Sequence, residues 1–365
     1  MGDVIAGRFE LIDPIAGGGS GAVWRALDRR TGQVCAAKVL RQRDSADLMR
    51  FVREKSVTFD HPNLLTPYGW AAEDAHVVIA MPLASGGTLE SLLRREGALG
   101  EAAIVVILQQ LLKGLAHMHE ERWIHRDVKP ANIMFSAAAD AERIQARLSD
   151  FGIAVHESDV RFTSAGMLNG TPGYMAPELF HLADPAPQQD LYAAGVVALV
   201  CWTGPMPLQD GAFSAQVLNR HLAGMEPTLQ GVIRTLLAPD TRDRYQSAEA
   251  ALADLPYVGP TTALLHRDGR PIAITQQIAT WVPTPTAAQS APSADAPPPS
   301  SPGAAAAAAR GLTLASAQAA GSADTPPAGP RRPSRIPLAL GITTGTLTGA
   351  AAGGLALWGI TSLLG

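Results

Sequence analysis

The sequence has little cysteine and few aromatic residues: two cysteines and 5% aromatic side chains in a chain of 365. Cys35 and Cys201 lie alone and far apart in apolar runs, which excludes a disulfide framework and a zinc-binding spacing. We therefore expect a reducing compartment. Residues 1–9 also lack the basic and apolar regions of a secretory signal, so no such signal is predicted.

Lysine is scarce as well, with four lysines among 29 basic residues, at positions 38, 55, 113 and 129. A lysine retained in so arginine-rich a chain can serve where a compact charge on a flexible stem is needed. The whole chain carries −4 and residues 256–365 carry +3 (six arginines, three aspartates), which leaves about −7 on residues 1–255. A mildly acidic folded part disfavours binding to a phosphate backbone, and no nucleic-acid partner is expected.

The residue patterns predict strands in the first third of the chain and helices in the second. Alternation and short apolar runs indicate strands at Phe9–Ile15, Ala22–Leu27, Val34–Leu40 and Val77–Leu83. Helices are indicated at Asp47–Thr58, Thr88–Arg95, Ile104–His119, Leu191–Trp202 and Ala248–Leu255. This order is typical of an α+β protein with two lobes.

The composition changes after residue 255. Proline, alanine, serine and threonine fill much of the segment, and no aromatic residue lies between Trp281 and Trp358. Such a segment buries too little apolar area to offset its ordering entropy, so residues 256–335 are predicted to form a disordered linker. Residues 336–365 carry no charge and exceed the roughly 20 residues that cross a bilayer. They predict a transmembrane anchor at 336–364, with glycine-rich low complexity as the alternative.

Arginines and glycines refine this membrane prediction. The arginines at 331, 332 and 335 precede the apolar segment, which favours a single-pass cell-membrane protein whose folded part is cytoplasmic. Four glycines recur at a spacing of four and share one side of a helix, here named the glycine face: Gly341, Gly345, Gly349 and Gly353. Such a face predicts a homodimer contact, unless the glycines only dilute a weak span.

A glycine cluster, residues 15–23, lies between the first two predicted strands. Glycines let backbone amides approach phosphate oxygens without obstruction by a Cβ, although a plain tight hairpin is the alternative. Lys38 ends an apolar strand, where an ammonium group is costly to bury without an anionic partner. The alternative for Lys38 is a strand-edge lysine whose ammonium reaches water.

The most specific pattern is a loop that reads His-Arg-Asp-Val-Lys-Pro-Ala-Asn at residues 125–132. It is followed by Asp-Phe-Gly at 150–152 and Ala-Pro-Glu at 176–178. The loop offers a carboxylate, a cation and an amide together, and Asp150 adds a second carboxylate. Such a set can accept a hydroxyl proton, neutralise phosphate and hold Mg²⁺. From Phe9 to Leu255 the chain resembles the eukaryotic-like bacterial serine/threonine protein kinases of the membrane-attached type.

The resemblance implies a protein kinase domain at residues 8–255, with a β-rich N-lobe and an α-helical C-lobe. It implies transfer of the γ-phosphate of ATP to Ser/Thr hydroxyls of proteins, including autophosphorylation, with Mg²⁺. Lys129 points to serine and threonine rather than tyrosine as acceptors. The catalytic residues that the resemblance implies are Asp127 as the base, Lys129 at the γ-phosphate and Lys38 at the α- and β-phosphates. Glu54, on the helix predicted at Asp47–Thr58, is the implied partner of Lys38. The implied metal ligands are Asn132 and Asp150.

The resemblance also implies nucleotide contacts and supporting residues. The contacts are Ile15, Ala16, Gly17, Gly18, Gly19, Ser20, Gly21, Ala22, Val23, Ala36, Lys38, Met81 and Ala84. Ala16 replaces the first glycine of the family pattern. Asp190 is expected to anchor the catalytic loop, Arg244 to pair with Glu178, and Thr171 to contact the catalytic aspartate. Glu54 lies seven residues before His61-Pro62-Asn63, and the usual spacing of about nine would select Val52 instead.

Two other functions are alternatives to phosphate transfer to proteins. A pseudokinase would bind nucleotide or act as a scaffold, but its usual signature is a lost lysine or aspartate, and Lys38, Asp127, Asn132 and Asp150 are all present. A small-molecule phosphotransferase is disfavoured by the Ala-Pro-Glu motif. Autophosphorylation is expected in the loop between Gly152 and Ala176, first at Thr163 and Ser164.

Overall fold

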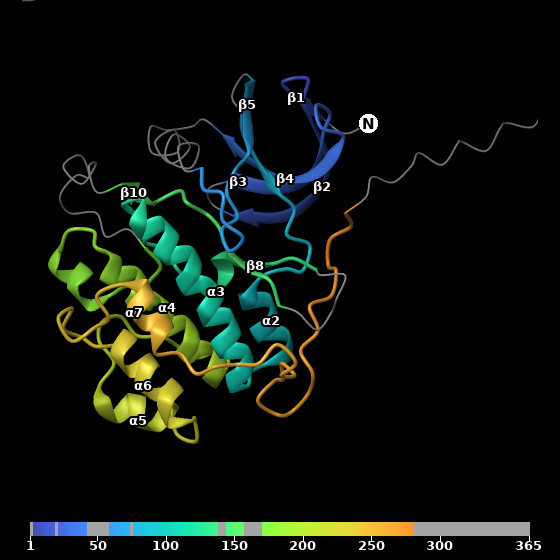
Figure 1. Cartoon of the computed structure of the whole chain (residues 1–365). Helices are drawn as coiled ribbons and strands as arrows, with labels where there is room; N and C mark the ends of the chain where they lie inside the picture. The colour runs from blue at the N-terminus through green and yellow to red at the C-terminus, as the bar shows by residue number, and fades with distance from the viewer. Residues whose placement is uncertain are drawn as a thin grey trace, which may run out of the picture. The chain divides into compact units, whose positions relative to one another are not determined.

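The computed structural model describes residues 3–18, 21–41, 58–73, 76–137, 144–156 and 170–280. The N-lobe is an antiparallel sheet with the order β1-β2-β3-β4-β6-β5 (Figure 1). Its strands are β1 (Val4–Ile5), β2 (Phe9–Gly18), β3 (Gly21–Asp28), β4 (Gln33–Arg41), β5 (Gly69–Glu73) and β6 (His76–Pro82). The four strands predicted from alternation and apolar runs are confirmed as β2, β3, β4 and β6.

The two faces of this sheet have different neighbours, because side chains alternate along each strand. One face of β4 places Cys35 and Ala37 in a core with Phe9. On the opposite face, Lys38 lies across from Val23 of β3, and Ala36 lies across from Met81 of β6. Residues paired across strands share a face. The sheet therefore brings several predicted nucleotide contacts onto one surface, here named the cleft face.

The C-lobe is mainly helical and contains the larger core (Figure 1). Its α-helices are α2 (Leu89–Glu96), α3 (Glu101–Glu120), α4 (Pro187–Thr203), α5 (Ala215–His221), α6 (Pro227–Leu236) and α7 (Ala248–Ala253). The chain between α3 and α4 contains short strands and 3₁₀ helices: β7 (Trp123–Ile124), η1 (Pro130–Asn132), β8 (Ile133–Phe135), β9 (Ala146–Leu148), β10 (Val155–His156) and η3 (Pro177–His181). All predicted helices within the described ranges are confirmed.

Local signals explain where these helices begin and end. Thr88 caps α2 by accepting from the Ser91 amide, while the Ser91 hydroxyl accepts from the Thr88 amide. Gly97, at φ 86°, ends the same helix in a conformation that suits glycine. Helix α4 has a proline in its first turn and is buried on nearly every side, from Gln189 to Trp202.

Among the described residues, α3 is the helix long and apolar enough to cross a membrane. It is the central helix of the C-lobe, and 56% of its apolar window is buried inside the protein. Packing in the core accounts for this apolarity. The anchor predicted at 336–364 and most of the predicted linker lie outside the described residues.

The folded part extends beyond the predicted boundary at Leu255. Residues 256–280, here named the C-terminal strap, pack along the C-lobe and continue toward the N-lobe sheet (Figure 1, orange). His266, Ile272 and Ile274 of this segment are buried. The prediction of a disordered linker from residue 256 is therefore wrong up to residue 280. Apolar residues here are too scattered to form a periodic pattern, but they fit into a surface made by distant elements.

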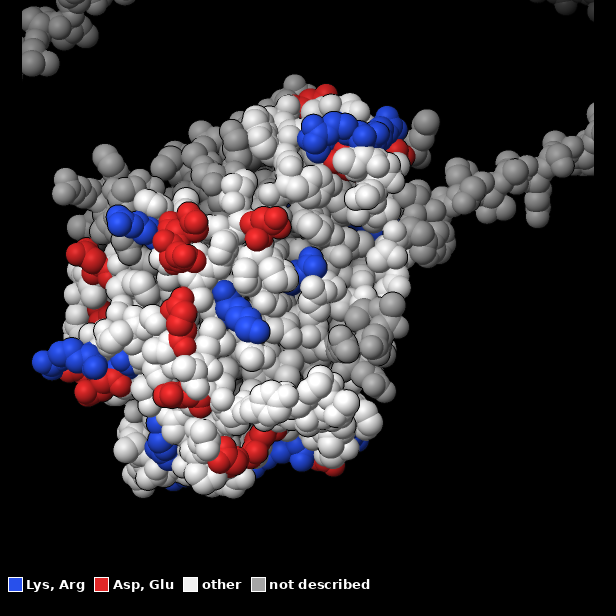
Figure 2. Space-filling model, viewed as in Figure 1, with Lys and Arg blue, Asp and Glu red and all other residues white. Residues whose placement is uncertain are grey.

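Charge is mixed on the face seen in Figure 2, where acidic and basic side chains alternate over both lobes. Exposed ion pairs of the described residues include Arg242 with Asp240 and Arg94 with Glu90. Exposed pairs of this kind contribute little to stability.

Candidate active site

The loop at residues 125–132, here named the catalytic loop, is held in place by Asp190 of α4. Its carboxylate accepts from the backbone amides of His125 and Arg126, both at 2.8 Å, and contacts His119 Nε2 at 2.9 Å. These interactions keep the pKa of the buried Asp190 below its ordinary value against the effect of burial. Arg126 has a φ of 69°, unusual for a residue with a Cβ, so the loop depends on this support. The predicted anchoring role of Asp190 is confirmed.

Asp127 is held by three side chains at the end of this loop. Its Oδ1 accepts from the Thr171 hydroxyl at 2.6 Å, and its Oδ2 accepts from Lys129 Nζ at 2.7 Å and Asn132 Nδ2 at 3.0 Å. Lys129 also donates to Thr171 Oγ1 at 2.7 Å. The predicted Thr171–Asp127 contact is therefore present. The Asp127 carboxylate therefore lies between the Lys129 side chain and the Thr171 hydroxyl.

His125 supports the same loop from the core. Its Nδ1 accepts from the Asp127 amide at 3.2 Å, and its Nε2 lies 3.1 Å from the Ser149 carbonyl. The side chain is fully buried, and this burial lowers its pKa. A neutral imidazole that bridges Asp127 and Ser149 joins the catalytic loop to the segment leading into Asp150.

Asp150 and Lys38 join the two lobes. Lys38 Nζ, from β4 of the N-lobe, lies 2.9 Å from Asp150 Oδ1. Burial opposes ionisation of Asp150, but the Lys38 charge and hydrogen bond more than offset it, so its pKa lies below the ordinary value. Asp150 has a φ of 65°, in the left-handed region that residues with a Cβ seldom adopt. The cleft face of the sheet thus faces Asp150.

The glycine cluster forms the end of the β2–β3 hairpin. Ala16 pairs with Val23, Gly17 with Ala22 and Gly18 with Gly21. Gly21 has a φ of 140°, and a Cβ there would lie 2.4 Å from the Val39 carbonyl oxygen. Only glycine lets the hairpin approach β4 this closely. Gly19 and Ser20 lie outside the described residues.

The connection between the lobes follows β6. Met81 and Pro82 end this strand, and Ala84 is buried with 3% of its surface exposed. Pro82 has no N–H and can offer only its carbonyl oxygen, whereas Ala84 retains an amide. This segment, residues 82–87, is here named the hinge.

The donors at this site suit a hard divalent cation such as Mg²⁺. Asn132 is buried, and its Nδ2 donates to the Asp127 carbonyl at 2.8 Å. This bond fixes the side-chain amide and leaves its Oδ1 as the atom that could bind a cation. Asp150 keeps 45% of its side chain exposed beside Lys38. A carboxylate with an amide oxygen is a ligand set that Mg²⁺ accepts, with water and phosphate completing its shell.

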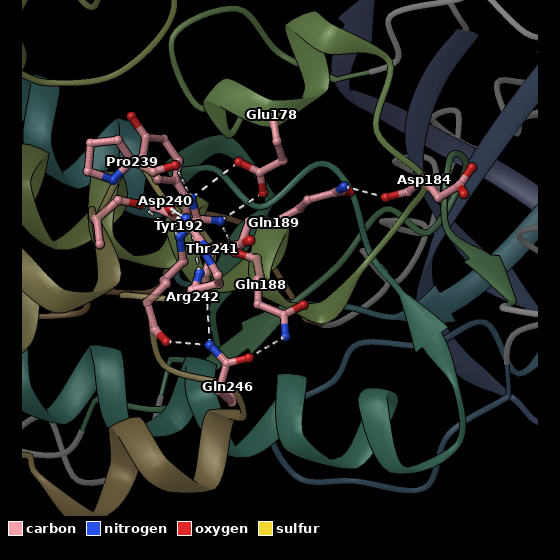
Figure 3. A network of polar contacts seen from close by, with 12 residues as sticks. Glu178, Asp184, Gln188, Gln189, Tyr192, Pro239, Asp240, Thr241, Arg242 and Gln246 are labelled. Carbon is pink, nitrogen blue, oxygen red and sulfur yellow. Dashed lines mark hydrogen bonds and ion pairs between the residues drawn. The ribbon is translucent and has the colours of Figure 1, made fainter.

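A polar network stabilises the segment after Thr171. Arg244 is buried and donates to both carboxylate oxygens of Glu178, at 2.8 and 3.2 Å, and to the carbonyls of Gln188 and Ala238. Figure 3 shows Glu178 and Gln188 within this network, beside Tyr192. The predicted Arg244–Glu178 pair is thus present. It ties the Ala-Pro-Glu turn to the start of α4.

Sequence reasoning missed three contacts that shape the site. The pairing of Lys38 with Asp150 was not expected, and neither was the bond from the Gly173 amide to Asp210 Oδ1 at 2.8 Å. The approach of the C-terminal strap to the hinge was missed too. No local pattern signals such long-range contacts. Glu54, the expected partner of Lys38, lies outside the described residues.

Comparison with known proteins agrees with this geometry. The sequence model of the protein kinase domain family matches residues 9–255 of this chain. The chain belongs to the protein kinase family. This kinase is 29% identical over 271 residues to the serine/threonine-protein kinase PrkC of Bacillus subtilis. It is 32% identical over 272 residues to PknL, and 32% identical over 266 residues to PknA, both serine/threonine-protein kinases of Mycobacterium tuberculosis.

These similarities cover 70%, 70% and 68% of this chain. They span 41% of PrkC, 67% of PknL and 60% of PknA. The similarity therefore identifies a eukaryotic-like bacterial kinase domain, and the two-lobed fold agrees with it.

Proposed function

We propose that this kinase transfers the γ-phosphate of ATP to serine and threonine hydroxyls of proteins. The observation that carries the proposal is the position of Asp127, whose carboxylate already accepts a hydroxyl hydrogen bond from Thr171 at 2.6 Å. An acceptor hydroxyl placed at the same carboxylate would be oriented for attack on phosphorus. The proposal is also supported by the names of the relatives.

The reaction assigns a task to each charged side chain. Asp127 orients the acceptor hydroxyl and takes its proton as the new O–P bond forms. The bond between the γ-phosphorus and the bridging oxygen breaks, and ADP leaves. Lys129 neutralises the transferred phosphoryl group, and Lys38 neutralises the phosphates of the leaving group. Asn132 and Asp150 would hold Mg²⁺, which when bound neutralises phosphate charge.

Labelled γ-phosphate transfer by the full-length protein tests this proposal, with mass spectrometry of the products. Asp127→Asn removes the base and should lower the rate about a hundredfold to ten-thousandfold. Lys38→Met removes the charge at the phosphates and should also lower it by orders of magnitude. A Lys38→Met protein with a near-wild-type rate would refute the assignment, while a wild-type protein that binds ATP without transfer would favour a pseudokinase.

We further propose that this kinase autophosphorylates between Gly152 and Ala176, first at Thr163 or Ser164, which lie outside the described residues. Arg126, adjacent to Asp127, carries the charge that a nearby phosphate requires. Peptide mapping of the wild-type protein after incubation with ATP tests this. Phosphate found only beyond residue 280, together with a fully active Thr163→Ala/Ser164→Ala protein, would contradict it.

The remaining proposal concerns location, and it rests on sequence alone. We propose a signalling kinase tethered to the cell membrane by residues 336–364, with its catalytic domain in the cytoplasm. The support is the uncharged segment 336–365 and the three arginines that precede it. Deletion of residues 336–365 should move the protein from the membrane fraction to the soluble fraction.

A further inference from the structure

The C-terminal strap is anchored to the C-lobe at its first half. His266 has 2% of its surface exposed, and its Nε2 lies 2.9 Å from Glu96 Oε2 at the end of α2. The Gly100 amide donates to the Leu265 carbonyl at 2.8 Å. The Arg267 guanidinium lies 3.8 Å from the ring centre of Trp202. These contacts give the strap a fixed base.

The second half of the strap is bonded to the hinge. The amides of Gln277 and Ile278 donate to the Ser85 carbonyl at 2.7 and 3.3 Å. The Gln277 side chain donates to the Gly86 carbonyl at 3.0 Å. A Cβ added at Gly86 would lie 2.5 Å from Ile274 Cγ2, so the strap and the hinge are in direct contact. Ser85 follows Ala84, whose amide is the expected adenine donor.

Two residues later the strap reaches the N-lobe. Arg25 of β3 donates from Nη1 to the Ala279 carbonyl at 3.1 Å, while its Nε and Nη2 bind Asp13 at 2.7 and 2.9 Å. Arg25 lies opposite Ala36 in the sheet and is 5% exposed. It therefore shares the cleft face with Val23 and Lys38. The strap ends at the edge of the proposed nucleotide site, on the N-lobe side.

We infer that the C-terminal strap is a positioning element of the nucleotide site, which restrains opening of the lobes and slows nucleotide release. Residues 277–279 connect the hinge to the cleft face of the N-lobe, and the base of the strap is fixed on the C-lobe. Lobe opening must therefore break the bond to Arg25 or the bonds to the hinge. The inference rests on the proposed function, because it assumes that the cleft binds ATP and releases ADP.

Release of a fluorescent ADP analogue from the full-length protein with Mg²⁺ tests this inference in stopped-flow measurements. Gln277→Ala removes the bond to Gly86 and should raise the dissociation rate about threefold to tenfold. Arg25→Lys keeps a cation for Asp13 but removes the guanidinium that bonds both Asp13 and the Ala279 carbonyl. It should raise the dissociation rate by a similar factor. Gln276→Ala is the matched control. Its side chain donates within the strap, to Ile278 O at 3.2 Å and Thr280 Oγ1 at 3.4 Å, so release should change less than about twofold.

Thermal melting of the same variants separates positioning from simple stabilisation. If Gln277→Ala and Arg25→Lys lower Tm but release the analogue at the wild-type rate, the strap is only structural and the inference fails. If the wild-type protein binds no ADP analogue, the proposed function fails and the inference falls with it. Faster release in both variants, with Gln276→Ala unchanged, supports the inference.

Discussion

At the scale of single residues, Thr171 shows how one hydroxyl organises the catalytic groups. It donates to Asp127 and accepts from Lys129, and so holds the base and the cation in one arrangement. Thr171→Ala should lower kcat about tenfold to a hundredfold, with KM for ATP nearly unchanged, because other groups hold the nucleotide. Thr171→Ser keeps the hydroxyl and should keep most activity. Equal losses in steady-state assays of both variants would assign the effect to the methyl group instead.

His125 makes stability depend on pH. Because burial lowers its pKa below the ordinary 6.5, the unfolded chain takes up a proton at a higher pH than the folded protein does. Its contribution to the free energy of unfolding is complete above pH 6.5 and is lost as the pH falls through the folded-state value. Melting curves between pH 7.5 and 5.5 should show Tm falling, with a shallower slope for His125→Gln. Parallel slopes would assign the acid sensitivity to other groups, such as His61, whose pKa burial also lowers.

The residues best predicted from sequence are those within short motifs. Asp127, Lys129 and Asn132 lie within six positions of one another, so their proximity follows from chain connectivity. The roles of Asp190 and Thr171 followed only from the family resemblance. The bond from Arg25 to Ala279 joins residues 254 positions apart, and neither local sequence contains a pattern that predicts it.

At the scale of elements, predictions succeeded where the signal is local. Apolar spacing indicated α3, and the Thr88 cap indicated the start of α2. The C-terminal strap has no strand or helix pattern, and its proline- and threonine-rich composition favoured disorder. Its order comes from isolated side chains that fit the C-lobe and from backbone bonds to the hinge. Composition indicates how much apolar area a segment can bury by itself. It does not show the apolar pockets and hydrogen-bond partners that a neighbouring surface provides.

This difference leads to a prediction for shortened proteins. A chain ending at residue 260 contains the whole matched domain, 9–255, but lacks Ile272 and Ile274, which are 7% and 5% exposed. Burial of each isoleucine contributes about 1.5–3 kcal/mol. The chain ending at 260 should therefore melt at least about 5 °C below one ending at 280. Thermal melts of the two proteins, side by side, check this. Equal Tm values would mean that the strap adds little stability.

At the scale of the whole molecule, two levels of contact can control this kinase. Within the described residues, Lys38–Asp150 and the strap both connect the N-lobe to the C-lobe. Beyond residue 280, the proposed linker and anchor would keep kinase domains near one membrane surface. Two domains joined through their anchors would meet at a high effective concentration, which favours phosphorylation of one chain by the other.

The glycine face allows this arrangement to be tested. Gly345→Ile/Gly349→Ile places branched side chains where two backbones would approach, and it should reduce both the crosslinked dimer in membranes and the rate of autophosphorylation. Thr344→Ile/Thr348→Ile is the matched control, because a shift of one residue moves the same substitutions about 100° around a helix. The control should leave both measurements unchanged. Since the kinase domain is untouched in either variant, transfer to an added protein substrate should stay at the wild-type rate. If the glycine variant crosslinks and autophosphorylates like the threonine variant, the glycine face makes no contact between chains.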